Sequence, residues 1–361
     1  MNVVVYDSLA SLPDKTRKAL SFPSTNDFFS AVDWHACLFA EVVSKELSLR
    51  IYCLEDLDKS PIAVLFCACE PGRQHLSSLT NFYTIHYSPV CPVESDTQCR
   101  SIERIIDYIG SERPRWKQIE FRYLQDEMKI TQCLIDGLRR KYVIEEYMQY
   151  ENWRLNINNR TFEEYYLERP SRLKNTISRK EKKLIKNYNM EMVIYREDNE
   201  QLQEAIEHFQ GIYESSWKQN EPYTSFIPSL IRQCAVLGVL RLGVLYLDRR
   251  AVASQFWITT EKVATIYKLA YDEEFKSLSP GSVLSKEMFR EAIDIDGVEE
   301  IDYGVGSENY KRDWMEFKES VKGVRVFNIR TISGFIGAIN LFGRKVLKSL
   351  LKKKYDSELK Q

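Results

Sequence analysis

Hydrophobic residues in the first 150 positions switch between the two-residue spacing of strands and the three-to-four-residue spacing of helices. Around 28–43, for example, Phe28, Val32 and Phe39 recur at helical spacing. In chain order, the pattern predicts a strand at 3–6, two helices of which the second spans about 28–43, a hairpin of strands at 49–55 and 62–70, a helix at 95–109, a strand at 118–124, a helix at 126–141 and a strand at 142–150. Together these elements predict one mixed α/β domain.

The second half approximately repeats this order of elements. The pattern predicts a strand at 153–157, a helix at 171–186, a strand at 191–195, helices at 199–217 and 226–237, strands at 240–247, 252–258 and 263–271, a helix ending near 294, a strand at 299–303, a helix from 307 and a strand at 324–329. We therefore expect two similar domains with mixed sheets, spanning 1–150 and 151–330.

Residues 331–361 have a different pattern, in which apolar residues recur at helical spacing between basic ones. The basic side chains exceed the acidic ones to give a local charge of +5. This pattern is typical of a basic amphipathic helix on an anionic membrane surface, and equally of a helix that docks on the protein. The uncharged stretch 331–343 is shorter than the roughly 20 residues that span a bilayer.

The composition excludes disorder as the main state, because 44% of the 361 residues are hydrophobic and 29% are charged. The net charge of −1 gives the whole chain no pull toward nucleic acid. The eight cysteines form no CxxC motif, and we expect reduced thiols and no metal site. The N-terminus has no apolar signal segment, so we expect a cytoplasmic protein, with the tail allowing contact with the inner face of a membrane.

The segment 169–186 carries eight basic residues and one acidic residue. On a helix, Leu173, Ile177 and Leu184 would form its buried line and leave most basic side chains in solvent. These side chains could gather phosphate groups, although a solvated helix face has the same pattern. RNA is the weaker possibility, since no second basic patch with interleaved aromatic residues is present.

Several motifs resemble one group of acyltransferases. They are Phe28-Phe29-Ser30 with Trp34, the basic run from Arg172 to Leu184, Ala270-Tyr271-Asp272 with Ser279-Pro280-Gly281, and Asp302-Tyr303-Gly304-Val305-Gly306 followed by Tyr310-Lys311 and Trp314. Over about 1–330 the chain resembles the CelD/BioF-like branch of the GNAT superfamily and the related Fem peptidyltransferases. The resemblance implies two tandem GNAT-like domains, of which the second is catalytic.

The resemblance also implies acetyl-CoA or another acyl-CoA as co-substrate. Residues expected to bind it are Lys276, Ser279, Gly281, Ser282, Val283, Leu269 and Tyr271. Small residues before a helix would direct backbone N–H groups and the positive end of the helix dipole at a pyrophosphate. The phosphate loop of the family is altered here, because serine occupies the position that is usually its first glycine.

In GNAT enzymes an amine attacks a thioester directly, which needs an acid for the leaving thiolate and a route for the proton of the amine. By resemblance, Tyr310 is the candidate acid and Asp302 a substrate orienter or proton acceptor. Candidate substrate-binding residues are Asp272, Lys311, Arg172 and Arg179. The histidines form no pattern with a serine or cysteine nucleophile, so no covalent enzyme intermediate is expected.

The predicted function is transfer of an acyl group, such as acetyl, to an amine on a cell-envelope or polysaccharide precursor. That acceptor class comes from the resemblance alone. Two alternatives stay open: a Fem-like transferase that uses aminoacyl-tRNA, and a non-catalytic GNAT-fold scaffold in an envelope-polysaccharide complex. The first lacks the helical arm usual in Fem proteins, and the altered phosphate loop favours the second.

Overall fold

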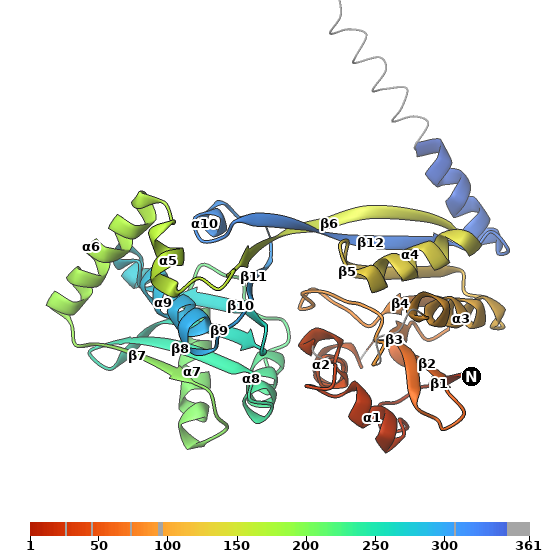
Figure 1. The fold of residues 1–361 in the computed structure, drawn as a ribbon, viewed down its shortest axis with the longest axis horizontal. Helices are drawn as coiled ribbons and strands as arrows, with labels where there is room; N and C mark the ends of the chain where they lie inside the picture. Colours follow the sequence, from red (N-terminus) through yellow and green to blue (C-terminus); the bar gives the residue numbers. More distant parts are fainter. Residues whose placement is uncertain (26, 45, 73, 93–96, 307, 345–361) are drawn as a thin grey trace, which may run out of the picture. The chain divides into compact units, whose positions relative to one another are not determined.

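A computed structural model describes residues 1–344 except 26, 45, 73, 93–96 and 307 (Figure 1). The chain divides into two compact units. The first comprises 1–25, 29–149 and 320–361, and the second comprises 26–28 and 150–319. The second unit therefore ends before the residue 330 expected from the sequence, because the last strand joins the sheet of the first unit.

The first unit contains a mixed sheet covered by helices. Its strands are β1 (Asn2–Tyr6), β2 (Ser48–Glu55), β3 (Pro61–Cys69), β4 (His75–Ser78), β5 (Gln118–Gln125), most of β12 (Phe317–Phe327) and the first half of β6 (Val143–Asn156). Its helices are α1 (Asp14–Leu20), η1 (Phe28–Ser30), α2 (Val32–Leu38), η2 (Phe39–Val43), α3 (Gln98–Ser111) and α4 (Lys129–Lys141).

The second unit contains a sheet of the same kind. Its strands are the second half of β6, β11 (Glu300–Val305), β10 (Val263–Tyr271), β9 (Arg250–Thr259), β8 (Leu240–Leu247) and β7 (Met190–Tyr195), in that spatial order. Its helices are α5 (Phe162–Leu167), α6 (Ser171–Asn187), α7 (Glu200–Glu214), α8 (Phe226–Val236), η3 (Glu273–Leu278), α9 (Pro280–Arg290), η4 (Glu291–Ile295) and α10 (Asn309–Arg312).

The two sheets share one pairing pattern. Four strands pair antiparallel in sequence (β1 to β4, and β7 to β10), and the fourth pairs parallel with a fifth (β4 with β5, β10 with β11). The sixth strand is antiparallel to the fifth in both units, but it is β12 in the first unit and β6 in the second. The expectation of two similar domains with mixed sheets is therefore confirmed.

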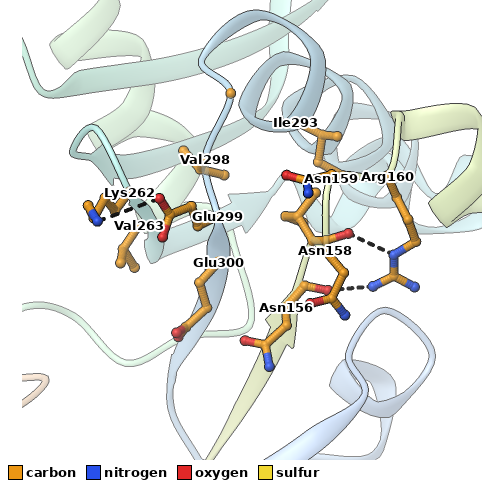
Figure 2. A pocket seen from close by; sticks show the side chains of 12 residues that line it. Asn156, Asn158, Asn159, Arg160, Lys262, Val263, Ile293, Val298, Glu299 and Glu300 are labelled. Carbon is orange, nitrogen blue, oxygen red and sulfur yellow. Dashed lines mark hydrogen bonds and ion pairs between the residues drawn. The ribbon is translucent and has the colours of Figure 1, made fainter.

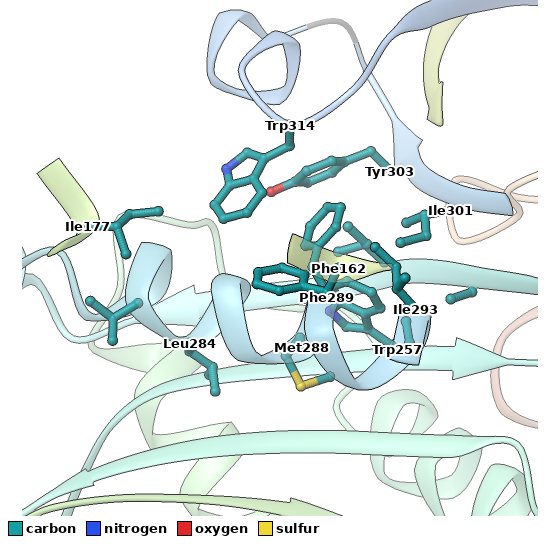
Figure 3. Close-up of a cluster of buried hydrophobic side chains, with 14 of the residues drawn as sticks. Phe162, Ile177, Trp257, Leu284, Met288, Phe289, Ile293, Ile301, Tyr303 and Trp314 are labelled. Carbon is teal, nitrogen blue, oxygen red and sulfur yellow. The ribbon is translucent and has the colours of Figure 1, made fainter. Parts of the chain in front are cut away.

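The core of the second unit lies between its sheet and α9. Leu284, Met288 and Phe289 of α9 are buried against the sheet, where Trp257 lies edge-on to Phe289 (Figure 3). Phe289 also stacks on Trp314, with ring centroids 4.7 Å apart. These contacts fix α9, and with it the position of its first turn, on the sheet.

Three local expectations differ from the structure. The predicted strands at 142–150 and 153–157 are one strand, β6, which passes from the first unit into the second. The predicted helix from 307 is only the single turn α10. Cys99 and Cys133 form a disulfide, so the expectation of reduced thiols is wrong for this pair; the packing of α3 against α4 brings their Cα atoms to 4.8 Å.

In the expected C-terminal helix, residues 332–344 are helical, and 345–361 lie outside the described residues. Among the helices that the structure describes, none is long and apolar enough to cross a membrane.

Candidate functional site

A cavity of about 430 Å³ lies in the second unit beside the end of β10 and the start of α9. This volume lies in the range of small-molecule sites. The residues that line the cavity are Leu173, Trp217, Gln255, Leu269, Tyr271, Lys276, Ser279, Gly281, Ser282, Ser285, Tyr303, Tyr310, Asp313 and Trp314.

The cavity lies where two parallel strands separate. β10 pairs with β11 only from Val263 to Thr265, opposite Glu300 to Asp302. Beyond this point β10 continues along β9 as far as Tyr271, whereas β11 pairs with β6. The gap between the two strands opens at their carboxyl ends, where α/β sheets present ligands.

The first turn of α9 forms one wall of the cavity. Ser279 precedes the helix with a left-handed backbone (φ 52°), and Pro280 occupies the first helical position. The Ser279 side chain makes no capping hydrogen bond to the helix. Gly281 and Ser282 follow at the cavity surface. The helix start thus presents its N-terminal dipole to the cavity.

A buried hydrogen-bond network holds this turn on the sheet. Gln255 of β9 donates from Nε2 to the Gly281 carbonyl (3.0 Å) and to Ser285 Oγ (2.7 Å). Trp257 Nε1 donates in turn to Gln255 Oε1 at 3.0 Å. Because Gln255 is fully buried, its network fixes the helix start relative to the strand.

Aromatic rings form the neighbouring wall. Tyr271 packs on Trp217, with ring centroids 4.5 Å apart. A Cβ atom added at Gly281 would lie 3.2 Å from Tyr271 Cδ1, closer than side chains normally approach. Glycine at 281 therefore lets the helix start approach Tyr271 without displacing its ring.

Two tyrosines of the cavity lie next to each other. Tyr303 and Tyr310 meet edge-to-face at 5.8 Å between centroids, with Tyr303 buried and Tyr310 half-exposed. Burial, together with the negative charge of Glu308, raises the pKa of Tyr310 above its usual range. The pKa of Tyr303 is raised well above its usual value, mainly by burial. Both phenols therefore keep their proton at neutral pH.

Lys218 lies next to Trp217 in the loop between α7 and α8. Its Nζ lies 5.4 Å from the Tyr213 ring centroid and 5.8 Å from that of Trp217. Burial, followed by the positive charge of Lys268, lowers its pKa to about 8. Lys268 itself pairs with Glu221 at 2.6 Å. The loop therefore holds a poorly solvated ammonium beside the aromatic wall.

The structure brings seven of the predicted site residues together in this cavity. They are Tyr310, Lys276, Ser279, Gly281, Ser282, Leu269 and Tyr271. Val283, predicted to bind the co-substrate, instead packs in the hydrophobic core.

Asp302 does not line the cavity. Its carboxylate is buried, where it accepts hydrogen bonds from Asn152 Nδ2 (2.6 Å) and the Gly304 backbone N–H (2.7 Å). Arg154 lies 3.7 Å away. These contacts hold β11 on β6 and fix the end of β11, so the structure places Asp302 as a support for the site.

Asp272 and Lys311 also lie outside the lining. Asp272 begins η3 by accepting the Glu274 N–H, and it pairs with Arg250 at 2.6 Å. Lys311 is buried, and its ammonium donates to the Val305 carbonyl at 2.6 Å and pairs with Glu308 at 2.9 Å. Burial lowers the pKa of Lys311 despite this pairing.

The two arginines predicted to bind substrate lie on the basic helix α6, and both are exposed. Arg172 pairs with Asp313 at 3.5 Å, and Asp313 lines the cavity. Lys180 of the same helix donates to the carbonyl of Ser277, just before the turn that precedes α9. The middle of α6 therefore lies beside the segment that precedes α9.

Sequence reasoning missed several lining residues: Trp217, Gln255, Ser285, Tyr303, Asp313 and Trp314. Tyr303, Asp313 and Trp314 fall within the motif around Asp302 but received no role. Trp217 and Gln255 lie far from that motif in sequence, and no spacing signal connects them to it.

A second and larger cavity, about 700 Å³, lies at the opposite ends of β10 and β11 (Figure 2). It is lined by 156–160 after β6 and by the first residues of β10 and β11. Its charged side chains are paired: Lys262 with Glu299 at 3.5 Å, and Arg160 with Glu316 at 2.8 Å. It lies away from the carboxyl ends of the strands, and the smaller cavity is the better candidate site.

Among the described residues, no cluster of three or more histidine, cysteine, aspartate or glutamate side chains is suited to hold a metal ion.

Part of the second unit matches a known protein family. Residues 171–312 match the family model described as an acetyltransferase (GNAT) domain. This range contains α6, the strands β7 to β11, α9 and Tyr310. No curated protein shows a significant match to the chain.

Solved structures share the fold over nearly the whole chain. FemX matches with a TM-score of 0.61 at 9% identity, covering 92% of this chain and 100% of FemX. The C-terminal domain of a putative lysylphosphatidylglycerol synthetase from Agrobacterium fabrum has a TM-score of 0.52 at 14% identity, covering 87% and 91%. L-PGS from Bacillus licheniformis has a TM-score of 0.52 at 9% identity, covering 85% and 95%.

Proposed function

From the membership of this chain in the GNAT superfamily, we propose that its second unit transfers an acyl group, in the simplest case acetyl, from acyl-CoA to an amine. The acceptor class implied by the sequence resemblance is a cell-envelope or polysaccharide precursor. The observation that carries the proposal is the cavity between the separated ends of β10 and β11, with the first turn of α9 on its wall.

The residues of this cavity fit an acyl-CoA. The start of α9 offers the Gly281 backbone N–H and a positive dipole to a pyrophosphate, while the Ser282 N–H donates to the Ser279 carbonyl at 3.1 Å. Leu269 and Tyr271 provide an apolar wall for the extended arm of the ligand. Serine in place of the usual glycine at 279 is compatible with this arrangement, because Ser279 adopts the left-handed backbone that the turn requires.

In the proposed reaction the thioester of acyl-CoA supplies the activated acyl group. The amine nitrogen bonds to the carbonyl carbon and releases one proton to solvent, the carbon–sulfur bond breaks, and the thiolate takes a proton. Tyr310 is the candidate donor of that proton, because its phenol is protonated at neutral pH and lies at the cavity. Asp302 supports the end of β11 from within the fold.

Two other functions are compatible with particular features. The exposed basic side chains of α6, which begins near the cavity, would suit a tRNA-linked donor, as in a Fem-like transferase. A non-catalytic scaffold would keep the fold without binding a donor. Binding of acyl-CoA would distinguish the proposed acyltransferase from both the Fem-like transferase and the non-catalytic scaffold.

Thermal unfolding of the full chain with and without acetyl-CoA tests the proposal. Ligand at a hundred times its dissociation constant should stabilise the protein by about 2.7 kcal/mol. Aminoacyl-tRNA and CoA without an acyl group serve as comparison ligands. No stabilisation by any acyl-CoA would refute the acyltransferase function.

The role of Tyr310 is tested in a preparation with measurable transfer activity. Tyr310→Phe should lower kcat by about 100-fold or more, the usual contribution of a general acid. Tyr303→Phe is the matched control, since it removes a neighbouring phenol from the same cavity. If the two variants lose activity equally, or if Tyr310→Phe retains full activity, Tyr310 is not the specific acid.

A further inference from the structure

The helix at 332–344 exposes a row of large apolar side chains. Five of them are at least half exposed: Ile332 (83%), Phe335 (53%), Ile336 (53%), Ile339 (53%) and Phe342 (56%). Their spacing of three to four residues places them on one face of the helix. Soluble proteins rarely leave such a continuous apolar face in water, and such a face usually marks an interaction site.

The opposite face of the same helix is already packed on the first unit. Ala338 and Leu341 are buried against Phe327 and Val143. The helix is therefore apolar on two faces, of which the fold buries only one. A helix of this kind needs a second apolar environment.

Close contacts prevent the helix from rotating to bury its outer face. A Cβ atom at Gly334 would lie 2.2 Å from the Asn328 carbonyl oxygen, and one at Gly337 would lie 2.5 Å from Phe327 Cδ1. Thr331 Oγ1 also accepts the Gly334 N–H at 3.1 Å. The two glycines let the helix pack closely against 327–328, and this packing sets which face is exposed.

The charges around this face point to its partner. Between residues 320 and 355 the sequence has no aspartate or glutamate. Arg330 precedes the helix and Arg344 ends its described part, and both are exposed. The sequence continues with basic residues at 345, 348, 352, 353 and 354. An apolar face flanked along the chain only by positive charge matches the surface of an anionic bilayer, where acyl chains lie beneath negative headgroups.

We propose that the helix at 332–344 binds this protein to an anionic membrane surface, with Phe335, Ile336 and Ile339 in the interface and Arg330 and Arg344 against the headgroups. This inference is independent of the acyltransferase function, because the cavity lies in the other unit.

Vesicle flotation of the full chain tests the proposal. The probes are vesicles of phosphatidylcholine alone and vesicles that also contain phosphatidylglycerol. We expect flotation with the anionic vesicles and much weaker flotation with the neutral ones. Salt should weaken the interaction, because the basic residues act through charge.

Two variants separate the apolar and the charged contributions. F335S/I339S removes two exposed apolar side chains and should lower partitioning into anionic vesicles by at least about 100-fold. R330Q/R344Q removes the two exposed positive charges that flank the helix and should lower it by about 30-fold. Leu57→Ser is the matched control, since it removes an apolar side chain that is 93% exposed elsewhere in the same unit.

Three results would overturn the inference. The first is no flotation of the full chain with anionic vesicles, and the second is equal flotation of wild type and F335S/I339S. The third is a wild-type protein that does not bind vesicles but forms a dimer, which the F335S/I339S substitutions dissociate. The last result would show that the face pairs with a second copy of the chain. Circular dichroism of each variant checks that the fold is retained.

Discussion

The two units share a strand order but differ at the place where their parallel strands meet. In the second unit β10 and β11 separate beyond Thr265 and Asp302, and a cavity lies there. In the first unit β4 ends at Ser78, and the following chain returns to the sheet. Tyr87 bridges to Leu124 of β5, and Val90 bridges to Val64 of β3.

The returning segment therefore occupies the position of a strand between β3 and β5. Its side chains Tyr83, Ile85, Tyr87 and Val90 are buried. Tyr87 donates its hydroxyl hydrogen to the Phe66 carbonyl at 2.9 Å. The comparison shows how one sheet topology can either bury the gap beside its parallel strands or leave it open to a ligand. The range that matches the acetyltransferase family model, residues 171–312, lies within the second unit.

The largest expected effect comes from removing the ring that fills the gap in the first unit. Tyr87→Ala should destabilise the protein by about 3–5 kcal/mol, because it leaves a cavity among fully buried residues. Leu269→Ala, at the open gap of the second unit, should cost about 1 kcal/mol, because that side chain already borders a cavity. Urea unfolding measures both.

If the free energies of unfolding of Tyr87→Ala and Leu269→Ala fell by the same amount, the contrast between a filled and an open gap would be wrong. The stabilisation by acetyl-CoA should persist in Tyr87→Ala, since its change lies in the other unit.

The next effect comes from filling the open gap. Gly281→Val adds a side chain whose Cβ would already crowd Tyr271, so it should abolish the stabilisation of about 2.7 kcal/mol expected from saturating acetyl-CoA. Gly211→Val is the matched control, because a Cβ at that helical position meets no atom within 4 Å. Calorimetry in the presence of acetyl-CoA compares the two; retained binding in Gly281→Val would place the ligand elsewhere.

The sequence predicted most of this fold, because most elements have regular hydrophobic spacing. The hairpin of β2 and β3 and the buried line of α6 through Ile177 and Leu184 are found as expected. The pairing of the sixth strands could not be predicted, since β12 pairs with β5 about 200 residues away in the sequence. Local spacing carries no information about such partners.

The candidate site was predicted only where its residues are close together in the sequence. Several residues of the stretch from Leu269 to Ser282 line the cavity. Asp302 and Lys311 were singled out as polar residues within a motif, but both are buried among partners that the sequence does not reveal. Gln255 and Trp217 reach the cavity only because β9 and the loop after α7 fold beside α9 and β10.

The smallest expected effect concerns the charge of Lys218, which lies beside the open gap of the second unit. Because burial lowers the pKa of Lys218 to about 8, the native state binds its proton less tightly than the unfolded chain does, whose lysine has a pKa near 10.4. Below pH 8 both states are protonated and the penalty is complete. As the pH rises from 8 toward 10.4, the native state loses its proton first, so this contribution to stability increases.

Lys218→Met should therefore stabilise the protein by about 1–2 kcal/mol at pH 7, allowing for solvent screening of a partly exposed group, and this gain should vanish above about pH 10. Lys268→Met is the matched control and should instead destabilise, since it removes the ion pair between Lys268 and Glu221. Urea unfolding at pH 7 and pH 10 measures both. An equal effect of Lys218→Met at the two pH values would show that burying the protonated Lys218 costs no stability. The edge of the open gap would then hold no unfavourable positive charge that a bound anion could relieve.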